Sequence, residues 1–480
     1  MSIWQTKSLS FLVREATSGQ QKLERTLGAW NLILLGIGAI IGAGLFSITG
    51  LAAAVHAGPA VILSFLIAAL GCLFAGLCFS ELAAMIPISG GAYSYAYVTL
   101  GEVVAWMVGW VMTLEYMMGA ALVAISWSAY VVSILQDFGI HLPTVLLASP
   151  WQTVSLPDGT HVHGIINLPP LLIVTVISGL LIWGVDKSAK VNAVLVFIKV
   201  AVVLTIITLG AFYIDPANYT PFIPENTGVF GEFGWSGVFT AAGLVFLGYV
   251  GFDTVSTMAQ EVKKPQQNLP IGIIGSLAIC TILFMLFAFV LVGLTPYSEL
   301  GVAAPVAAAI QHTPYLWLNG LVKCAIIAGL TSVVLVLLLG QSRIFFTMAK
   351  DGLLPSCLSI VHPKYHTPWV SSVILMGLVG LFSGFAPLYL VGQLTSIGSL
   401  IVFTIVCGSV IVLRKTHPHL PRPFKTPWVP LVPILGMVSC LLLVASLGWS
   451  TSLQLLVWLI MGLGIYFLYG KKHSHLQNTH

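Results

Sequence analysis

Charged side chains inside apolar runs are the residues of this sequence whose types and positions suit chemistry. Lys199 lies nine residues beyond Lys190 in an otherwise apolar run, which corresponds to about 13 Å of helix. A lysine so far from the nearest polar segment cannot easily carry its ammonium group to water. The amine should therefore face the protein interior and either have a partner or be neutral. We expect Lys199 to lose and regain a proton during a functional cycle; the alternative is a static amine bound to backbone carbonyls.

Two acids and a second lysine also lie in or beside apolar runs, so each of them needs a partner or a function. Glu115 lies 13 residues after Glu102, about 20 Å along a helix and deep in its apolar run. Three roles are open to it: a partner for Lys199, a contact for a cationic ligand, or part of a polar interior patch. Asp253 follows a glycine-rich stretch, where it is equally suited to capping the next helix and to gating. Lys323 lies near the end of another apolar run, where a lysine side chain normally reaches the interface.

Glycine clusters interrupt two of the apolar runs, at 36–46 and at 246–253. Glycine in a helix interior costs roughly 1 kcal/mol relative to alanine, so such clusters predict broken helices whose free backbone groups have a use. Inside a membrane, non-helical backbone survives only where protein or a polar cavity satisfies it. The alternative is that these glycines only let neighbouring helices approach closely.

The direction of each broken helix decides which of its backbone groups are free. Where a new half-helix begins, free N–H groups and the positive end of the dipole suit a carboxylate. Where the opposite-running helix breaks, free carbonyls accept hydrogen bonds from an ammonium group. A gap with both features matches an α-amino acid. The groups expected to be free are the carbonyl of Ile40, the N–H groups of Ala43, Gly44 and Leu45, and the carbonyls of Leu247 and Val250.

Composition and hydropathy set the class of protein. The 480 residues are 58% hydrophobic and 7% charged, with a mean hydropathy of +1.00, which excludes a set of soluble domains and predicts an all-α polytopic membrane protein. A helix needs about 20 apolar residues to cross roughly 30 Å of hydrocarbon. Twelve such transmembrane helices are predicted, near 29–50, 59–86, 102–134, 167–185, 190–213, 235–259, 270–294, 317–347, 368–386, 388–413, 428–447 and 450–470.

The distribution of charge predicts the orientation of the chain in the membrane. Seventeen of the nineteen Lys and Arg residues lie at the termini, in the even-numbered connections or at the span ends beside them. The positive-inside rule therefore places both termini in the cytoplasm, with the protein in the cytoplasmic (inner) membrane. This bias explains the net charge of +4, so no nucleic-acid partner is implied. The seven cysteines show no disulfide or metal-ligand spacing, and no metal or cofactor is expected.

Spans one to five match spans six to ten, because each set begins with a broken helix. Five is an odd number, so the second set is upside down relative to the first, as in the inverted repeats of many secondary transporters. In the outer connection 137–166 we expect a small hairpin with its turn at 156–160. The predicted parts are a cytoplasmic N-terminal segment (1–28), a first five-helix repeat (29–213), a second repeat (235–413), two extra helices (428–470) and a cytoplasmic tail (471–480).

Five motifs are specific when taken together: GAIIGAGLF at 38–46, GYVGFD at 248–253, EVKKPQ at 261–266, GQSR at 340–343 with DGLLP at 351–355, and RPFKTP at 422–427. On these motifs the chain resembles the amino acid/polyamine/organocation superfamily, in particular bacterial members close to cationic amino acid transporters. The resemblance runs from about Leu27 to Lys472. It implies an inverted-repeat core that works by alternating access, with an amino acid bound between the first and sixth helices.

The resemblance also implies roles for single residues. Relatives of this branch use a lysine in place of a sodium ion, which makes Lys199 the proton-linked lysine, and Glu115 looks like the third-helix glutamate of the same branch. The substrate would be surrounded by backbone atoms of Ile40, Ala43, Gly44, Leu247 and Val250.

Two departures from the family pattern concern the substrate side chain. Leu247 stands where many relatives have a bulky aromatic residue that closes over the substrate. Leu337 occupies a position of the eighth span that we expect to face the side chain. An apolar pair at these positions favours neutral substrates.

The predicted function is a proton-coupled permease that imports L-amino acids by symport, and not an enzyme. An exchanger that swaps amino acids without net proton movement is the first alternative. A proton-conducting subunit of a membrane enzyme would also bury Lys199 and Glu115, but it would not need paired breaks in an inverted repeat. The sequence leaves the particular amino acid and the oligomeric state open.

Overall fold

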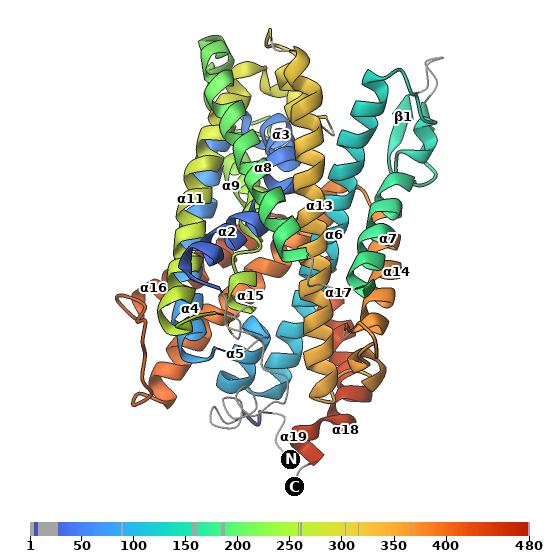
Figure 1. The fold of residues 1–480 in the computed structure, drawn as a ribbon. Helices are drawn as coiled ribbons and strands as arrows, with labels where there is room; N and C mark the ends of the chain where they lie inside the picture. The colour runs from blue at the N-terminus through green and yellow to red at the C-terminus, as the bar shows by residue number, and fades with distance from the viewer. Residues whose placement is uncertain are drawn as a thin grey trace.

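The structure is a computed structural model that describes residues 4–7, 27–87, 90–155, 161–183, 188–257, 259, 262–302, 304–314, 316–365 and 367–478. Nearly every element is a helix, and the helices stand side by side in one bundle (Figure 1). The longer helices are α2 (Ala29–Ile40), α4 (Val61–Met85), α6 (Glu102–Asp137), α7 (Leu168–Trp183), α8 (Ser188–Gly210), α9 (Gly234–Val245), α11 (Pro265–Leu294), α13 (Leu316–Lys350), α14 (Trp369–Phe385), α15 (Leu388–Thr416), α16 (Leu431–Ser446) and α17 (Trp449–Ile465).

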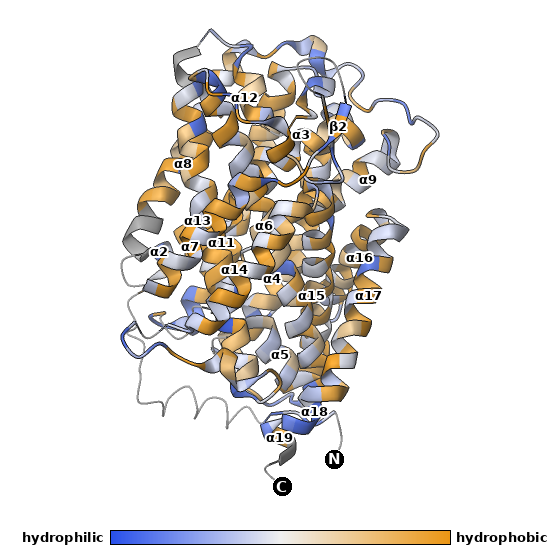
Figure 2. Cartoon of the chain, turned by 90° about the vertical axis from the view of Figure 1, so that its right-hand side faces the viewer, coloured by the Kyte–Doolittle hydropathy of each residue, from blue (hydrophilic) through white to orange (hydrophobic). Residues whose placement is uncertain are grey.

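Eight helical runs among the described residues are long and apolar enough to cross a membrane. Colouring by hydropathy shows apolar residues along the helices and polar residues gathered toward the two ends of the bundle (Figure 2). The predicted all-α membrane protein is therefore confirmed, while the count of twelve crossings stays a prediction. The eight runs are Gly44–Met85, Glu102–Asp137, Val194–Tyr213, Gly234–Thr257, Pro265–Leu294, Asn319–Lys350, Leu388–Thr416 and Trp449–His473, and α2, α7, α14 and α16 are shorter apolar helices.

Helix α6 is the central element of the bundle. Helix α13 packs along α6, and α15 packs on it as well, while α11 packs against both α2 and α4. Buried alanine and glycine positions let these helices approach closely, as is usual between transmembrane helices. The broken helices are thereby enclosed by α4, α6, α11, α13 and α15.

Lys323, near the start of α13, has a partner that the sequence did not indicate. Its side chain is only 1% exposed, and its Nζ lies 2.6 Å from Oδ2 of Asp137 at the end of α6. The ammonium group is covered and its partner is a 43% exposed carboxylate at the end of the neighbouring helix, so the expected reach to the interface stays a prediction. This ion pair joins the ends of the two most closely packed helices.

The predicted hairpin in the outer connection is present. Strands β1 (Thr153–Ser155) and β2 (His161–His163) pair antiparallel, with Val154 opposite Val162. The predicted turn at 156–160 lies outside the described residues.

The end of the bundle that carries both termini is closed by a short buried helix, α5 (Gly91–Thr99). Tyr93 of α5 donates a hydrogen bond to Oδ2 of Asp351 at 2.6 Å. Lys7, from the N-terminal segment, reaches the other oxygen of the same carboxylate at 2.5 Å. The backbone N–H of His475 donates to the carbonyl of Asp351 at 3.1 Å, so Asp351 joins three distant parts of the chain.

Glu102, at the start of α6, is a second junction at this end. It is fully buried and accepts hydrogen bonds from the hydroxyl groups of Tyr97, at 2.9 Å, and Tyr466, at 2.8 Å. Ser474 donates to Oε2 at 2.5 Å. A buried carboxylate is stable only with such donors, so Glu102 joins α5 to the C-terminal end of the chain.

Candidate functional site

The first predicted break lies between α2 and a π-helical turn, η1 (Gly44–Ile48). Helix α2 ends at Ile41, whose extended backbone (ψ 102°) redirects the chain. The N–H groups of Leu45 and Phe46 both donate to the carbonyl of Gly42 at 3.1 Å. The expected free N–H at Leu45 is therefore wrong, because a tight turn already uses it. The N–H groups of Ala43 and Gly44 come before the first complete turn, so the helix offers them no acceptor.

The second predicted break follows α9. A single 3₁₀ turn, η7 (Phe246–Tyr249), leads to extended backbone at Val250 (ψ 133°). Gly251 then adopts a positive φ of 118°, a conformation that L side chains rarely adopt. The helix resumes only as the short α10 (Thr254–Thr257). The carbonyl of Leu247 accepts one bond, from the N–H of Val250 at 3.1 Å.

The two breaks lie directly against each other. A Cβ added at Gly44 would collide with the backbone of Gly248, at 2.7 Å from its nitrogen. A Cβ added at Gly251 would lie 3.0 Å from the carbonyl carbon of Ala39. These glycines therefore do let the two helices approach closely, which was the alternative use expected for them. The close approach brings the interrupted segments of both helices to one place.

One cavity between the breaks is lined by all six predicted substrate-binding residues. Its free space is about 30 Å³, which is room for about one or two water molecules. The site is thus closed in this conformation, and an amino acid can enter only after its walls separate. The predicted residues in its lining are Ile40, Ala43, Gly44, Leu247, Val250 and Leu337.

Further lining residues were missed in the sequence, although helical spacing offered a signal for some of them. Gly119 lies four residues after Glu115 on α6, and Val333 lies four residues before Leu337 on α13, so each shares a helix face with a predicted residue. Nothing in the sequence singled out Thr395 of α15. The residues missed are Ala39, Gly42, Gly119, Leu122, Val123, Val333 and Thr395.

The chemical character of this cavity is apolar apart from its backbone groups. Among the described lining residues, Thr395 alone has a polar side chain, and its hydroxyl donates to the carbonyl of Val391 in its own helix at 2.7 Å. Leu247, Leu337 and Val333 present hydrocarbon. Charge can therefore be recognised here by free backbone groups, whereas the side-chain space suits an uncharged group.

Lys199 of α8 is fully buried and reaches the first break. Its Nζ donates to the carbonyl of Gly38 and, at 3.1 Å, to the carbonyl of Ile41. These two carbonyls flank Ala39 and Ile40 of the cavity lining. The contacts are those of the static alternative, and they place the ammonium group of Lys199 at the first break.

Glu115 of α6 is 1% exposed, and both of its carboxylate oxygens lack a hydrogen-bond partner among the described residues. The pairing with Lys199 that was one of its three open roles is not formed, since Lys199 bonds to carbonyls instead. Its Cβ packs closely on Gly398 of α15. Orphaned buried oxygens of this kind require an explanation from function or from a proton.

Asp253 closes the second break from its inner side. Its Oδ1 accepts from the N–H of Gly251 at 3.1 Å, and its Oδ2 accepts from the hydroxyl of Tyr116 at 2.9 Å. Tyr116 is the neighbour of Glu115 on α6. The aspartate thus ties the chain after the second break to α6 and does not serve only as a helix cap.

Comparison with known proteins agrees with this arrangement. The family model for amino acid permeases matches residues 27–468. The chain is 44% identical to the branched-chain amino acid permease BcaP of Bacillus subtilis and 41% identical to a methylthioribose transporter of the same organism, each over 99% of both chains. It is 33% identical to a vacuolar cationic amino acid transporter 4 of Arabidopsis thaliana, over 83% of this chain and 65% of that one. The chain is a multi-pass plasma-membrane protein, not an enzyme, and it belongs to the amino acid permease family of the amino acid/polyamine/organocation superfamily.

Proposed function

We propose that this protein is a proton-coupled symporter that imports L-amino acids with uncharged, apolar side chains. The observation that carries the proposal is the single cavity between the two backbone breaks, with Lys199 bonded to the first of them. The N–H groups of Ala43 and Gly44 would receive the substrate carboxylate. Carbonyls near Ile40, Leu247 and Val250 would receive its ammonium group.

The proposed topology follows from the same breaks. Twelve crossings with both termini in the cytoplasm would arrange 29–213 and 235–413 as inverted five-helix repeats, with 428–470 as two extra helices. The substrate would then lie where the repeats meet and be exposed to each side in turn. Asp253 would act as a gate, since its bond to Tyr116 crosses between the second break and α6.

Proton coupling is assigned to Lys199 and Glu115. A neutral amine has two N–H donors, which is enough for its two carbonyl partners, so Lys199 can release a proton without abandoning either bond. The first break would then lose the positive charge that holds it. Glu115, with two unpartnered oxygens, offers a second proton site four residues from the cavity lining at Gly119.

The substrate side chain is assigned from Leu247 and Leu337. With Val333 they form a hydrocarbon pocket that has no group to pair with a charged side chain. The names of two relatives point to a branched-chain amino acid and to methylthioribose. Leucine, isoleucine and valine fit both the backbone groups of the breaks and the hydrocarbon side chains of the lining. Methylthioribose has no carboxylate for the N–H groups.

The decisive experiment is uptake by purified protein in proteoliposomes. Labelled leucine, valine, arginine and methylthioribose are each offered with an inward proton gradient, without a gradient, and with a gradient collapsed by an ionophore. We expect accumulation of leucine and valine that depends on the gradient, and little uptake of arginine. Absence of uptake for every amino acid would overturn the proposal. Uptake that ignores the gradient but rises when the liposomes are preloaded with amino acid would establish the exchanger instead.

A further inference from the structure

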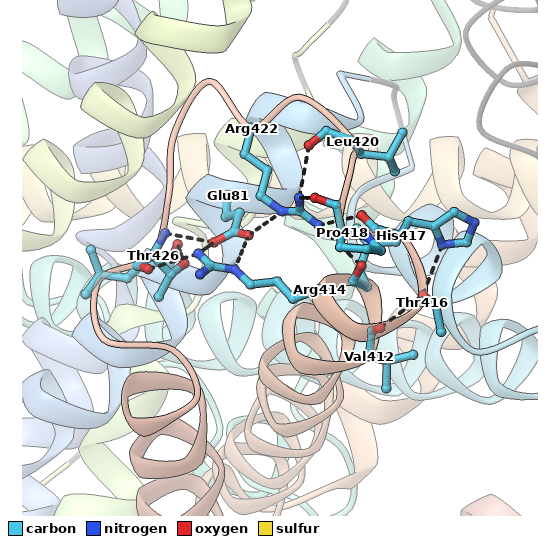
Figure 3. Close-up of polar contacts among 11 residues, drawn as sticks. Glu81, Val412, Arg414, Thr416, His417, Pro418, Leu420, Arg422 and Thr426 are labelled. Atoms are coloured by element: carbon cyan, nitrogen blue, oxygen red, sulfur yellow. Dashed lines mark hydrogen bonds and ion pairs between the residues drawn. The ribbon is translucent and has the colours of Figure 1, made fainter.

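A buried carboxylate holds two arginines at the end of α15. Glu81, near the end of α4, is 1% exposed and receives Arg414 in a two-pronged contact, 3.0 Å from Nε to Oε1 and 2.7 Å from Nη2 to Oε2. The Nε of Arg422 lies 3.4 Å from Oε1, and the N–H of Thr426 donates to Oε2 at 2.7 Å. Both guanidinium groups therefore converge on one carboxylate (Figure 3).

Arg422 is fixed further by carbonyls of the loop that follows α15. Its Nη1 donates to the carbonyls of Pro418 and Leu420, at 3.0 and 2.9 Å, and its Nη2 donates to that of His417 at 2.9 Å (Figure 3). The side chain is 7% exposed. The guanidinium is thus held in place before any ligand arrives, which lowers the entropy cost of binding.

These arginines form one wall of an open cavity of about 220 Å³ that is also lined by Pro418 and Lys425. One water needs only about 10–15 Å³ by the same kind of measure. Three cations and one carboxylate (Glu81) leave a net charge of about +2 around it. Lys425 is exposed and has no ion pair within the part of the chain that the structure describes. The described bonds of Arg414 use Nε and Nη2 and leave Nη1 unused.

The geometry selects the class of anion. Nη1 of Arg414 can donate to an oxygen of a phosphate group, while Arg422 adds a fixed positive charge and Lys425 a mobile one. The cavity borders the start of α16, where Trp428 is 79% exposed and Leu431 is 52% exposed. Exposed tryptophan beside basic side chains is typical of the level at which lipid headgroups lie.

We propose that the cavity lined by Arg414, Arg422 and Lys425 is a binding site for a phosphate-ester group. The group belongs either to an anionic phospholipid or to a soluble phosphate ester. Glu81 keeps the two guanidinium groups in place, and the surplus positive charge binds the ligand. Because Glu81 belongs to α4 and Arg414 to α15, and both helices pack on the second break, the ligand would brace two walls of the transport site.

Lys425→Gln is the informative variant, because Lys425 lines the cavity without holding the fold. Lys415→Gln is its matched control: an exposed lysine next to Arg414 that is absent from the lining. Purified full-length protein in neutral detergent is titrated with phosphatidylglycerol, with phosphatidylcholine and with glycerol 3-phosphate. Binding is followed by native mass spectrometry and by the midpoint of thermal unfolding.

We expect phosphatidylglycerol to bind and to raise the unfolding midpoint, and phosphatidylcholine to do so much less. Lys425→Gln should weaken binding about fivefold, the usual effect of one basic charge near an anionic headgroup, and Lys415→Gln should leave it unchanged. Binding of glycerol 3-phosphate with the same dependence on Lys425 would identify a soluble ester as the ligand. Equal weakening by both variants, or no preference for the anionic ligands, would overturn the proposal.

Discussion

Two lysines are buried in the helices among the described side chains, and they are held in opposite ways. Lys199 is 0% exposed and Lys323 is 1% exposed, yet Lys323 has the carboxylate of Asp137 at 2.6 Å whereas Lys199 has only the carbonyls of Gly38 and Ile41. A nearby carboxylate such as that of Asp137 favours the charged amine, and it would lose its counter-charge if the proton departed. Carbonyls accept hydrogen bonds from a neutral amine as well, although more weakly than from an ammonium group. We therefore expect Lys323 to be a fixed structural charge and Lys199 to change its charge during transport.

The largest difference between the two lysines is expected in transport. In Lys199→Ala, accumulation of leucine driven by a pH gradient should fall to the level reached without a gradient. For a one-proton symporter, a gradient of one pH unit supports roughly tenfold accumulation, since one unit is worth about 1.4 kcal/mol. The assay is proteoliposome uptake, with counterflow exchange as the control for folded protein. Full accumulation by this variant would show that Lys199 is only structural.

The second difference concerns stability. Asp137→Asn leaves Lys323 buried without a counter-charge, and the expected loss is about 1–3 kcal/mol of unfolding free energy, below the roughly 3–5 kcal/mol of fully buried pairs because Asp137 is 43% exposed. The loss is measured as a lower unfolding midpoint in detergent. The gradient dependence of uptake by the remaining folded protein should not change. An unchanged midpoint would contradict the assignment of this ion pair as structural.

Removing both Lys323 and Asp137 tests whether this ion pair is only structural. Lys323→Met combined with Asp137→Asn removes the unpaired charge, so stability should return to within about 1 kcal/mol of the original protein. The double-mutant cycle is built from the unfolding midpoints of the two single variants and the double variant. Recovery of stability together with a loss of proton dependence would show that Lys323 also takes part in transport, against the difference proposed here.

The smallest expected effect comes from the packing around Lys199. In Gly329→Ala on α13, the new Cβ would lie 3.1 Å from the Cβ of Lys199, so the lysine stem must move by a few tenths of an ångström. Gly320→Ala, on the same helix with open space around it, is the matched control. Both gain up to about 1 kcal/mol from helix propensity, but Gly329→Ala alone should slow uptake, by about twofold to threefold. Equal uptake by the two variants would mean that the position of Lys199 is not critical.

Local sequence features predicted the helices, the breaks and five of the cavity residues, because each depends on hydropathy, glycine content and chain direction. Leu337 was named only through the family resemblance. The partner of Lys323 could not be predicted, because it depends on how far α6 and α13 extend relative to each other. The bond from Tyr116 to Asp253 depends likewise on the rotation of α6. The N–H of Leu45 was misjudged because hydropathy does not report that Gly42 closes a tight turn.

The junctions at Asp351 and Glu102 have a consequence for the biosynthesis of the protein. Tyr466 and Ser474 follow their partner Glu102 by 364 and 372 residues, so a ribosome makes nearly the whole chain before that carboxylate has all of its donors. Lys7 waits similarly for Asp351, which lies 344 residues later. Quality control that removes membrane proteins with unpaired buried charges would therefore recognise a chain that stops before Tyr466, even when its transport site is fully formed.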